Sequence, residues 1–247
     1  MTAGIAWMAA FPVAQADRAV EALLRSWTVM ASKPRPGFAP AAKEPKLTRV
    51  VRAHVRKQIA PEMKLLGHWG TEGVENDVDF ETGEILEEGR TDIEYTWNDE
   101  STQLALVFEF KKLTPDNQSR RRYLQDGLMK FVTGVYSEKQ PVALMVGILL
   151  APRNETVDGL RRDINLSATA AAIRACANGD GRFVLSPVLF PKRTTFDTEH
   201  LRDPEKAPPH GTIRIAHVFV GFPYAVFPDR KSKRKARLMA EDELGLQ

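Results

Sequence analysis

The sequence lacks most of the short motifs that identify common classes of enzyme. Its 247 residues include a single cysteine, Cys176, which excludes an intramolecular disulfide and any zinc site built from several cysteines. It contains no phosphate-binding Gly-x-x-x-x-Gly-Lys loop, no dinucleotide glycine fingerprint and no nucleophile elbow. None of its five histidines lies four residues from another, the spacing at which two histidines of a helix bind zinc. These absences disfavour the corresponding chemistries and leave the chain without a motor motif.

Long apolar runs are absent as well. No span approaches eighteen uninterrupted apolar residues, so we expect no transmembrane helix and no membrane partner. Residues 4–16 imitate a short signal peptide, but they lack a basic start and Pro12 interrupts the apolar run, which argues against secretion. An apolar content of 43%, a net charge of +3 and a pI near 9.0 favour a cytoplasmic protein with one substantial core. This mildly basic character permits a nucleic-acid partner without requiring one.

The most informative feature that is present is a predicted β-hairpin formed by residues 90–97 and 104–112. Its second strand is apolar except for Glu109 and Lys111, and charges in such a strand are costly to bury unless they are paired or bind a metal. Because side chains alternate along a strand, the second strand is expected to have two distinct faces. These faces carry Ala105, Val107, Glu109 and Lys111 on one side and Leu104, Leu106, Phe108 and Phe110 on the other.

The length of the hairpin loop decides what faces Glu109. A four-residue loop at 99–102 places Asp92 opposite Glu109 and Arg90 opposite Lys111. Two carboxylates and an ammonium group on one face suit one hard divalent cation and one oriented water. A five-residue loop would move Asp92 to the far face and destroy the site. The alternative is a solvent-facing hairpin in which Glu109 and Lys111 form an ordinary surface pair.

Elements on both sides of the hairpin indicate an α/β fold. Residues 44–59 and 120–136 have apolar side chains at helical spacing, and residues 142–150 form a continuous apolar run after Pro141. Such a run is typical of a strand in the middle of a sheet that is covered on both faces. We therefore expect a mixed central sheet with helices on both faces, in the order helix, hairpin, helix, buried strand.

At this point the chain resembles the PD-(D/E)xK nuclease superfamily, the restriction-endonuclease-like fold. The matching residues are Asp92, sixteen intervening residues, and then Glu109-Phe110-Lys111. The resemblance covers about residues 40 to 150, where the superfamily has a helix, three strands, a helix and a strand. It implies that Asp92, Glu109 and the backbone carbonyl of Phe110 hold Mg²⁺, for which Mn²⁺ can substitute. Lys111 would then orient the attacking water and stabilise charge on the phosphate.

The resemblance also suggests two further members of the site. The first helix of the superfamily often adds an acidic residue, which makes Glu44 a candidate; alternatively, Glu44 is only a charge that complements the helix start. A glutamine or a tyrosine on the second helix accompanies the active site in many relatives. Gln125 and Tyr123 both lie on this helix, and Gln125 is the candidate. Gly127 on the same helix either permits close approach to another backbone or is simply tolerated there.

Three consecutive arginines and a basic tail are candidates for binding nucleic acid. Arg120, Arg121 and Arg122 open the second helix close to the end of the motif strand, near Lys112, and could hold backbone phosphates. A solvated helix start is the alternative. Six of the eight residues at 230–237 are basic. This segment either binds phosphates or an acidic partner, or it is simply a solvated end of the chain.

Three segments are expected along the chain. Residues 1–39 form an N-terminal helical extension and linker, with an extended lead-in at 1–12 and a helix near 16–31. Residues 40–229 form the nuclease-like domain, and residues 230–247 form the basic tail. In the second half of the domain we expect a helix at 157–177, strands at 183–190 and 213–220, and a polar loop at 192–211. His217 is expected to be a satisfied core histidine, and Cys176 a small core hydrophobe.

The function expected from the resemblance is metal-dependent endonucleolytic hydrolysis of DNA in restriction or anti-phage defence. The alternative is a non-catalytic nucleic-acid-binding or assembly subunit of a defence or repair complex. Because the chain has no motor motif, a helicase or ATPase would have to come from a partner protein. Double-strand cutting with one site per chain would need a homodimer or a second encounter.

Overall fold

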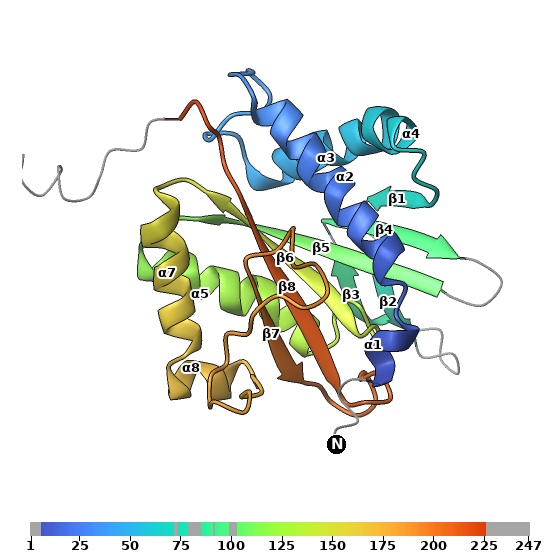
Figure 1. Cartoon of the computed structure of the whole chain (residues 1–247), viewed down its shortest axis with the longest axis vertical. Coiled ribbons are helices and arrows are strands. Elements are labelled where there is room, and N and C mark those ends of the chain that lie inside the picture. Colours follow the sequence, from blue (N-terminus) through green and yellow to red (C-terminus); the bar gives the residue numbers. More distant parts are fainter. Residues whose placement is uncertain (1–5, 72–73, 79–84, 91, 99–102, 226–247) are drawn as a thin grey trace, which may run out of the picture.

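The protein has an α/β fold built around a mixed six-stranded sheet (Figure 1). The structure is a computed structural model and describes residues 6–71, 74–78, 85–90, 92–98 and 103–225. The strand order in the sheet is β1-β4-β5-β6-β8-β7, and β2 and β3 form a separate two-stranded sheet. The strands are β1 (His68–Thr71), β2 (Val74–Val78), β3 (Ile85–Arg90), β4 (Ile93–Asn98), β5 (Gln103–Leu113), β6 (Val142–Leu149), β7 (Phe196–Leu201) and β8 (Thr212–Val220).

Helices cover both faces of the six-stranded sheet (Figure 1). One face packs against α2 and α3, and the other packs against the segment from α5 to α6 and against α7. Within the described residues, no helix has the length and apolar character needed to cross a membrane. The helical segments are α1 (Ala6–Ala10), α2 (Val13–Ala31), α3 (Glu44–His54), the π-helical η1 (Val55–Ile59), α4 (Ala60–Glu62), α5 (Asn117–Arg122), the π-helical η2 (Tyr123–Leu128), α6 (Met129–Val132), α7 (Arg153–Ile164) and α8 (Ser167–Ala172).

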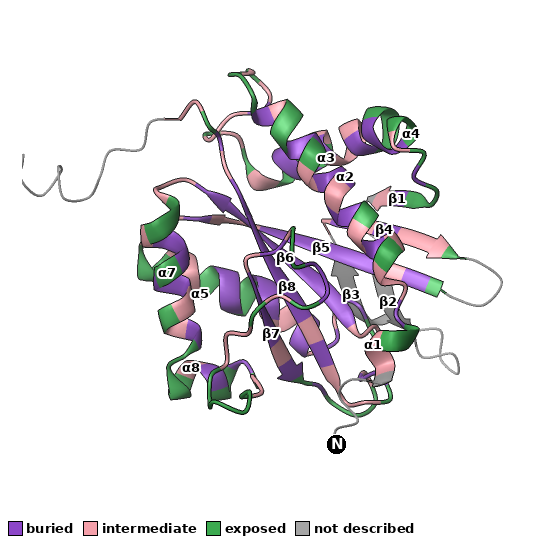
Figure 2. Ribbon diagram, viewed as in Figure 1, coloured by how far each residue is buried: buried purple, intermediate pink, exposed green. Residues whose placement is uncertain are grey.

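The alternation predicted for β5 is confirmed. Leu104, Leu106, Phe108 and Phe110 belong to the apolar cluster under α2 and α3, whereas Val107 belongs to the cluster under η2 and α6. The continuous apolar run at 142–150 forms β6, which is buried along its whole length between β5 and β8 and runs parallel to both (Figure 2). A strand with neighbours on both edges and helices on both faces has no solvent-facing side.

The predicted order of elements also agrees with the structure. A helical segment from α3 to α4 is followed by β1, β4 and β5, then by the helical segment from α5 to α6, and then by β6. The small β2–β3 sheet is inserted between β1 and β4. The helix predicted near 16–31 is α2, and it packs into the same apolar cluster as β5 and β6, so it contributes directly to the core of the sheet.

The segment before α2 was predicted incorrectly. The lead-in predicted to be extended contains the short helix α1, followed by Phe11, which is only 9% exposed. Trp7 of α1 stacks on His210 with ring centroids 4.8 Å apart. A helical turn brings the apolar side chains of this segment to one side, where they can pack on the core. This burial favours a helix over an extended lead-in.

The predicted helix at 157–177 is interrupted. It is two helices, α7 and α8, separated by Asn165 and by Leu166, whose backbone is extended. Cys176 follows α8 and is only partly buried, so the core position expected for it inside a helix is wrong. Its backbone N–H donates to the carbonyl of Glu199 at 2.7 Å, which ties this segment to β7.

The strand predicted at 183–190 and the loop predicted at 192–211 are both wrong. Residues 183–190 are irregular apart from one bridge between Leu185 and Asp197, although Leu189 and Phe190 are buried. The regular edge strand β7 instead lies inside the predicted loop and pairs with β8 in antiparallel orientation. Pro187 has no backbone N–H to donate to a strand ladder, which disfavours a strand at 183–190.

His217 is a satisfied core histidine, as predicted. It is fully buried in β8, with the Tyr123 hydroxyl 2.8 Å from Nδ1 and the Thr198 hydroxyl 2.9 Å from Nε2. Thr198 also contacts Nε2 of His200 at 2.7 Å, and Nδ1 of His200 is 2.7 Å from the carbonyl of Ile173. Burial lowers the pKa of His217 well below its ordinary value and the pKa of His200 to about 4, so both rings are neutral near pH 7.

Candidate active site

The register of the β4–β5 hairpin is the one that brings Asp92 to Glu109. Asn98 pairs with Gln103 and Ile93 pairs with Phe108, so four residues connect the two strands, as predicted; these four lie outside the described residues. Continuing the register by one residue places Asp92 opposite Glu109. The backbone N–H of Phe110 donates to Oδ2 of Asp92 at 2.8 Å and fixes that carboxylate beside the strand.

Lys111 lies at the centre of the charged cluster. Its Nζ is 2.6 Å from Oε1 of Glu109, 3.0 Å from the carbonyl of Phe110 and 3.3 Å from Oε1 of Glu44. Burial alone would lower the pKa of Lys111, but the carboxylates of Glu109 and Glu44 outweigh burial and raise that pKa above its ordinary value. The Lys111 side chain is therefore an ammonium ion over the whole physiological range.

Glu44 joins the helix start to the end of the motif strand. It is the first residue of α3, and its Oε2 accepts a hydrogen bond from the backbone N–H of Lys112 at 2.8 Å. Its Oε1 contacts Lys111, so the structure brings Glu44 to the same ammonium group as Glu109. The alternative in which Glu44 only complements the helix start does not account for these two contacts.

The Asp92 carboxyl has a strongly perturbed pKa. Burial, followed by the negative charge of Glu109, raises the pKa of Asp92 to about 7, against the opposing effects of the Phe110 N–H and of Lys111. A carboxylate that is costly to ionise in this way gains from a nearby cation, because the cation stabilises its charged form. Perturbed carboxyls of this kind are concentrated at functional sites.

The strand pairing does not place Arg90 opposite Lys111, which corrects that part of the prediction. Arg90 ends β3 and pairs with Val74 in the two-stranded sheet. The hairpin strand β4 starts only at Ile93, and Lys111 pairs with Gly147 of β6. Arg90 therefore pairs within the two-stranded sheet, and the ladder of the hairpin begins only after it.

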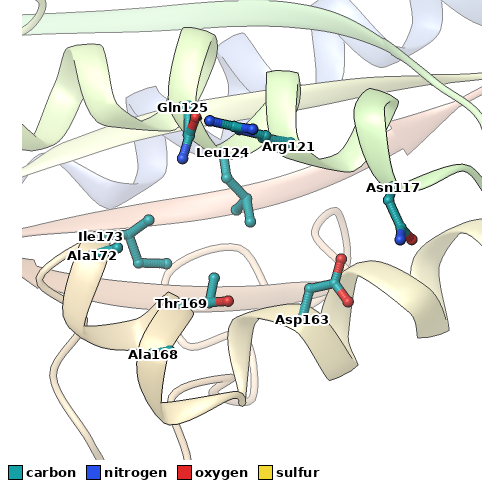
Figure 3. Close-up of a pocket in the computed structure, with 9 residues that line it drawn as sticks. All are labelled: Asn117, Arg121, Leu124, Gln125, Asp163, Ala168, Thr169, Ala172 and Ile173. Carbon is teal, nitrogen blue, oxygen red and sulfur yellow. Dashed lines mark hydrogen bonds between the residues drawn. The ribbon is translucent and has the colours of Figure 1, made fainter.

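Gln125 does not lie with the charged cluster of the hairpin. It is exposed, and its Oε1 accepts a hydrogen bond from Nε of Arg121 at 2.8 Å. The two side chains line a pocket of about 310 Å³ between η2 and α8, where they face Thr169 and Ile173 (Figure 3). Neither the hydrogen bond of Gln125 nor the pocket that it lines includes a carboxylate of the hairpin. The structure therefore does not bring Gln125 together with Asp92 and Glu109.

The four basic residues predicted to bind phosphates differ in their surroundings. Nε of Arg120 is 2.6 Å from Oδ2 of Asp163, with the Arg120 side chain only 11% exposed, and Nζ of Lys112 donates to the carbonyl of Pro40 at 2.8 Å. The charged groups of Arg120 and Lys112 therefore already have partners within the protein. Arg121 and Arg122 are exposed on α5. The basic tail lies outside the described residues.

Two residues of the cluster were missed by the sequence analysis. Nζ of Lys130 lies 3.3 Å from Oε1 of Glu109 and donates to the hydroxyl of Tyr136 at 2.7 Å. Lys130 follows Gly127 by three residues and therefore lies on the same side of the helical segment. That spacing is the sequence signal that could have identified Lys130; Tyr136 has none, because it follows the helix.

Gly127 is where the helical segment meets the motif strand. A Cβ atom at this position would lie 2.7 Å from Cε of Met145 and 3.2 Å from Cγ of Lys111. The absence of a side chain lets the stem of Lys111 pass beneath η2 on its way to Glu109. The prediction named close approach to another backbone, whereas the atoms nearest to Gly127 belong to the side chains of Met145 and Lys111.

We expect Gly127→Ala to lower the free energy of unfolding by about 1 kcal/mol, because overpacking outweighs the better helix propensity of alanine. Chemical denaturation measures the change. Gly179→Ala is the matched control, since nothing lies within 4 Å of a Cβ placed there. A Gly127→Ala protein at least as stable as the wild type would show that the contact with Lys111 is not tight.

The oxygen atoms of this cluster suit a hard divalent cation, although they do not form a complete ligand set. Throughout the described ranges, no three or more His, Cys, Asp or Glu side chains are grouped so that they could hold a metal ion. The donors at hand are the carboxylates of Asp92 and Glu109 and the carbonyl of Phe110, and Mg²⁺ is commonly held by one or two carboxylates with water completing its shell. The ammonium of Lys111 already lies among these oxygens, which shows that the cluster accommodates positive charge.

Comparisons with known proteins do not assign this chain to a family. No family model, curated protein or solved structure matches it. The chain is therefore identified by its own geometry alone, as an α/β protein with two carboxylates and an ammonium ion gathered on adjacent strands of its sheet.

Proposed function

We propose that the protein is a metal-dependent endonuclease that hydrolyses phosphodiester bonds in DNA. The observation that carries the proposal is the convergence of Asp92, Glu109 and Lys111 at one end of the β4–β5 hairpin. A rigid pair of carboxylates suits a hard cation, and an adjacent ammonium ion suits the charge that develops on a phosphate during hydrolysis. The order of helices and strands around the hairpin supports a restriction-endonuclease-like core.

Asp92, Glu109 and the carbonyl of Phe110 would hold Mg²⁺ or Mn²⁺. When bound, the ion would activate water and neutralise charge on the phosphate. The raised pKa of Asp92 means that its carboxyl carries a proton in a large share of metal-free molecules near pH 7. That proton must leave before Asp92 can act as a ligand, so metal affinity should rise as the pH increases through about 7.

Lys111 would act as a hydrogen-bond donor and as a fixed positive charge. Its raised pKa makes it a poor general base, because a base must release its proton to be ready for reaction. The ammonium group can instead donate to the attacking water or to a phosphate oxygen. To do so it must give up part of its contact with Glu109 and Glu44.

The experiment that tests this function uses four substrates: supercoiled plasmid, linear duplex DNA, single-stranded DNA and RNA. Each is incubated with purified protein in the presence of Mg²⁺ or of EDTA. We expect Mg²⁺-dependent nicking or linearisation of the plasmid and no reaction in EDTA. Inactivity on all four substrates would contradict the proposal for the isolated chain. Addition of a helicase or ATPase encoded beside it would then test whether cleavage depends on that partner.

The biological role that we propose is restriction, defence against phage or DNA repair. It rests on the resemblance of Asp92 and Glu109-Phe110-Lys111 to the superfamily motif. A single site per chain would cut both strands through a homodimer or through successive encounters.

A non-catalytic nucleic-acid-binding or assembly subunit of a defence or repair complex is the second candidate function. The observation that favours it is the 2.6 Å ion pair between Lys111 and Glu109, because a bound ammonium competes with a metal ion for the same oxygen. In such a subunit the cluster would be a structural ion-pair network. The occupancy of the site by Mn²⁺ distinguishes the two candidates.

Arg121 and Arg122 are the residues of the arginine run that we expect to contact phosphates, because both are exposed. Replacing both by Gln should flatten the dependence of log K on log salt by roughly 1.8, since each duplex phosphate contact contributes roughly 0.9. Fluorescence anisotropy with duplex DNA in EDTA measures this slope. Arg120→Gln is the contrasting variant, expected to lower Tm through loss of the Asp163 ion pair. An unchanged slope would show that Arg121 and Arg122 do not contact phosphates and are ordinary solvated surface residues.

A further inference from the structure

Glu109 is held by two ammonium groups rather than one. Lys111 and Lys130 both contact the same oxygen, Oε1, at 2.6 Å and 3.3 Å. The Glu109 side chain is only 2% exposed, so its charge depends on these partners rather than on bulk water. Its second oxygen, Oε2, takes part in neither contact.

Tyr136 fixes the position of the second ammonium group. Nζ of Lys130 donates to the Tyr136 hydroxyl at 2.7 Å and lies 4.6 Å from the centre of the Tyr136 ring. The Tyr136 side chain is almost fully buried, and its ring packs edge-on against Phe131. The Tyr136 N–H donates to the Lys130 carbonyl at 3.0 Å, so backbone and side chain both connect the two residues.

The loop that carries Tyr136 is itself held in an unusual conformation. The loop has positive φ angles at Gly134, Ser137 and Lys139, of 79°, 56° and 56°. The guanidinium of the buried Arg202 donates to the carbonyl of Tyr136 at 3.0 Å and to that of Ser137 at 2.8 Å. Residues with side chains adopt positive φ at an energetic cost, and such conformations persist where the surroundings impose them.

We infer that Lys130, held by Tyr136, is a positioning residue that fixes Oε1 of Glu109 while Lys111 moves to the substrate. This inference rests on the function proposed above and adds a residue to it. Breaking a buried ion pair on one side leaves an uncompensated charge, which is strongly unfavourable. With Lys130 in place, Lys111 can leave Glu109 without that penalty, and Oε2 stays available to a metal ion.

The inference predicts opposite effects of Lys130→Met on metal binding and on turnover. The variant should bind Mg²⁺ several-fold more tightly, because a positive charge next to Glu109 is gone. Its kcat should fall by roughly 10- to 100-fold, the usual cost of removing a residue that orients a metal ligand, with KM for DNA unchanged. Tyr136→Phe should change both quantities in the same directions by less. The matched control is Lys139→Met, in the same loop but 68% exposed, and it should behave as the wild type.

Metal binding is followed by the Mg²⁺-dependent shift in Tm, which needs no substrate, and turnover by nicking of supercoiled plasmid. Unchanged metal binding and unchanged kcat in Lys130→Met would overturn the role of Lys130. A parallel loss of metal binding and turnover would also overturn it, since Lys130 would then only support the folded site. A wild-type protein that shows neither a Mg²⁺-dependent Tm shift nor cleavage would instead remove the proposed function, and this role with it.

Discussion

Lys111→Met is expected to lower the rate of Mg²⁺-dependent cleavage by at least about a hundredfold, the usual cost of removing one group that stabilises transition-state charge. Methionine keeps an unbranched stem that can pass beneath Gly127 but removes the ammonium that contacts Glu109 and Glu44. DNA binding in EDTA should persist. Single-turnover nicking of supercoiled plasmid measures the effect on the chemical step.

The metal-free Lys111→Met protein should also lose stability, because two carboxylates lose a partner. Rates are therefore compared where circular dichroism shows that both proteins are folded. Lys112→Met is the matched control, since the Lys112 ammonium bonds to the carbonyl of Pro40 rather than to a carboxylate of the cluster. Wild-type cleavage by a folded Lys111→Met protein would remove Lys111 from the mechanism.

Asp92→Asn is expected to stabilise the metal-free protein at pH 8 while abolishing its response to Mg²⁺. The folded-state pKa of about 7 lies above the ordinary value of 3.8, so the folded protein retains a proton that the unfolded chain releases. The contribution of Asp92 to stability is therefore fully present below about pH 4 and is lost as the pH rises through 7. Asparagine avoids that loss, which is on the order of 2 to 4 kcal/mol and corresponds to roughly 5 to 15 °C in Tm.

Thermal unfolding of both proteins at pH 4, 6 and 8, with and without Mg²⁺, tests this prediction. The difference in Tm between Asp92→Asn and the wild type should grow with pH in EDTA. Mg²⁺ should raise the Tm of the wild type alone. A variant that is less stable than the wild type at pH 8 in EDTA would show that ionised Asp92 is well compensated by Lys111 in the absence of metal.

The hairpin could be predicted from the sequence because two simple rules act on it together. Alternation separates Phe108 and Phe110 from Glu109 and Lys111, and the loop length then fixes the register that brings Asp92 to Glu109. The fully buried strand β6 was equally clear, because its apolar run has no polar interruption. Both features are local, so no knowledge of distant contacts was needed.

The rest of the candidate site depends on contacts between distant segments. Lys130 reaches Glu109 from the helical segment that runs from α5 to α6, which crosses β5 at Gly127. Tyr136 lies beside Lys130 in a loop whose carbonyls at Tyr136 and Ser137 accept hydrogen bonds from the distant Arg202. Gln125, which the resemblance placed in the site, lies instead on the exposed side of η2 beside Arg121. Helical spacing alone did not determine which side of η2 faces the sheet.

Strand β7 was missed for a different reason. Asp197, Thr198 and His200 are polar, so their sequence predicts a loop, yet all three are fully buried. Thr198 and His200 belong to a hydrogen-bonded chain that continues through His217 to Tyr123, and the two hydrogen bonds of Thr198 offset the cost of burying its hydroxyl. A polar strand of this kind is recognisable only once its partners are known.

Anomalous diffraction from crystals soaked in Mn²⁺ tests the central claim most directly, because it locates the metal independently of activity. The account predicts one anomalous peak between the carboxylates of Asp92 and Glu109 and next to the carbonyl of Phe110, with the Lys111 ammonium displaced from Glu109. An absence of any peak there, with Lys111 still paired to Glu109 as in the 2.6 Å contact described above, would contradict the metal site and favour a non-catalytic binding subunit.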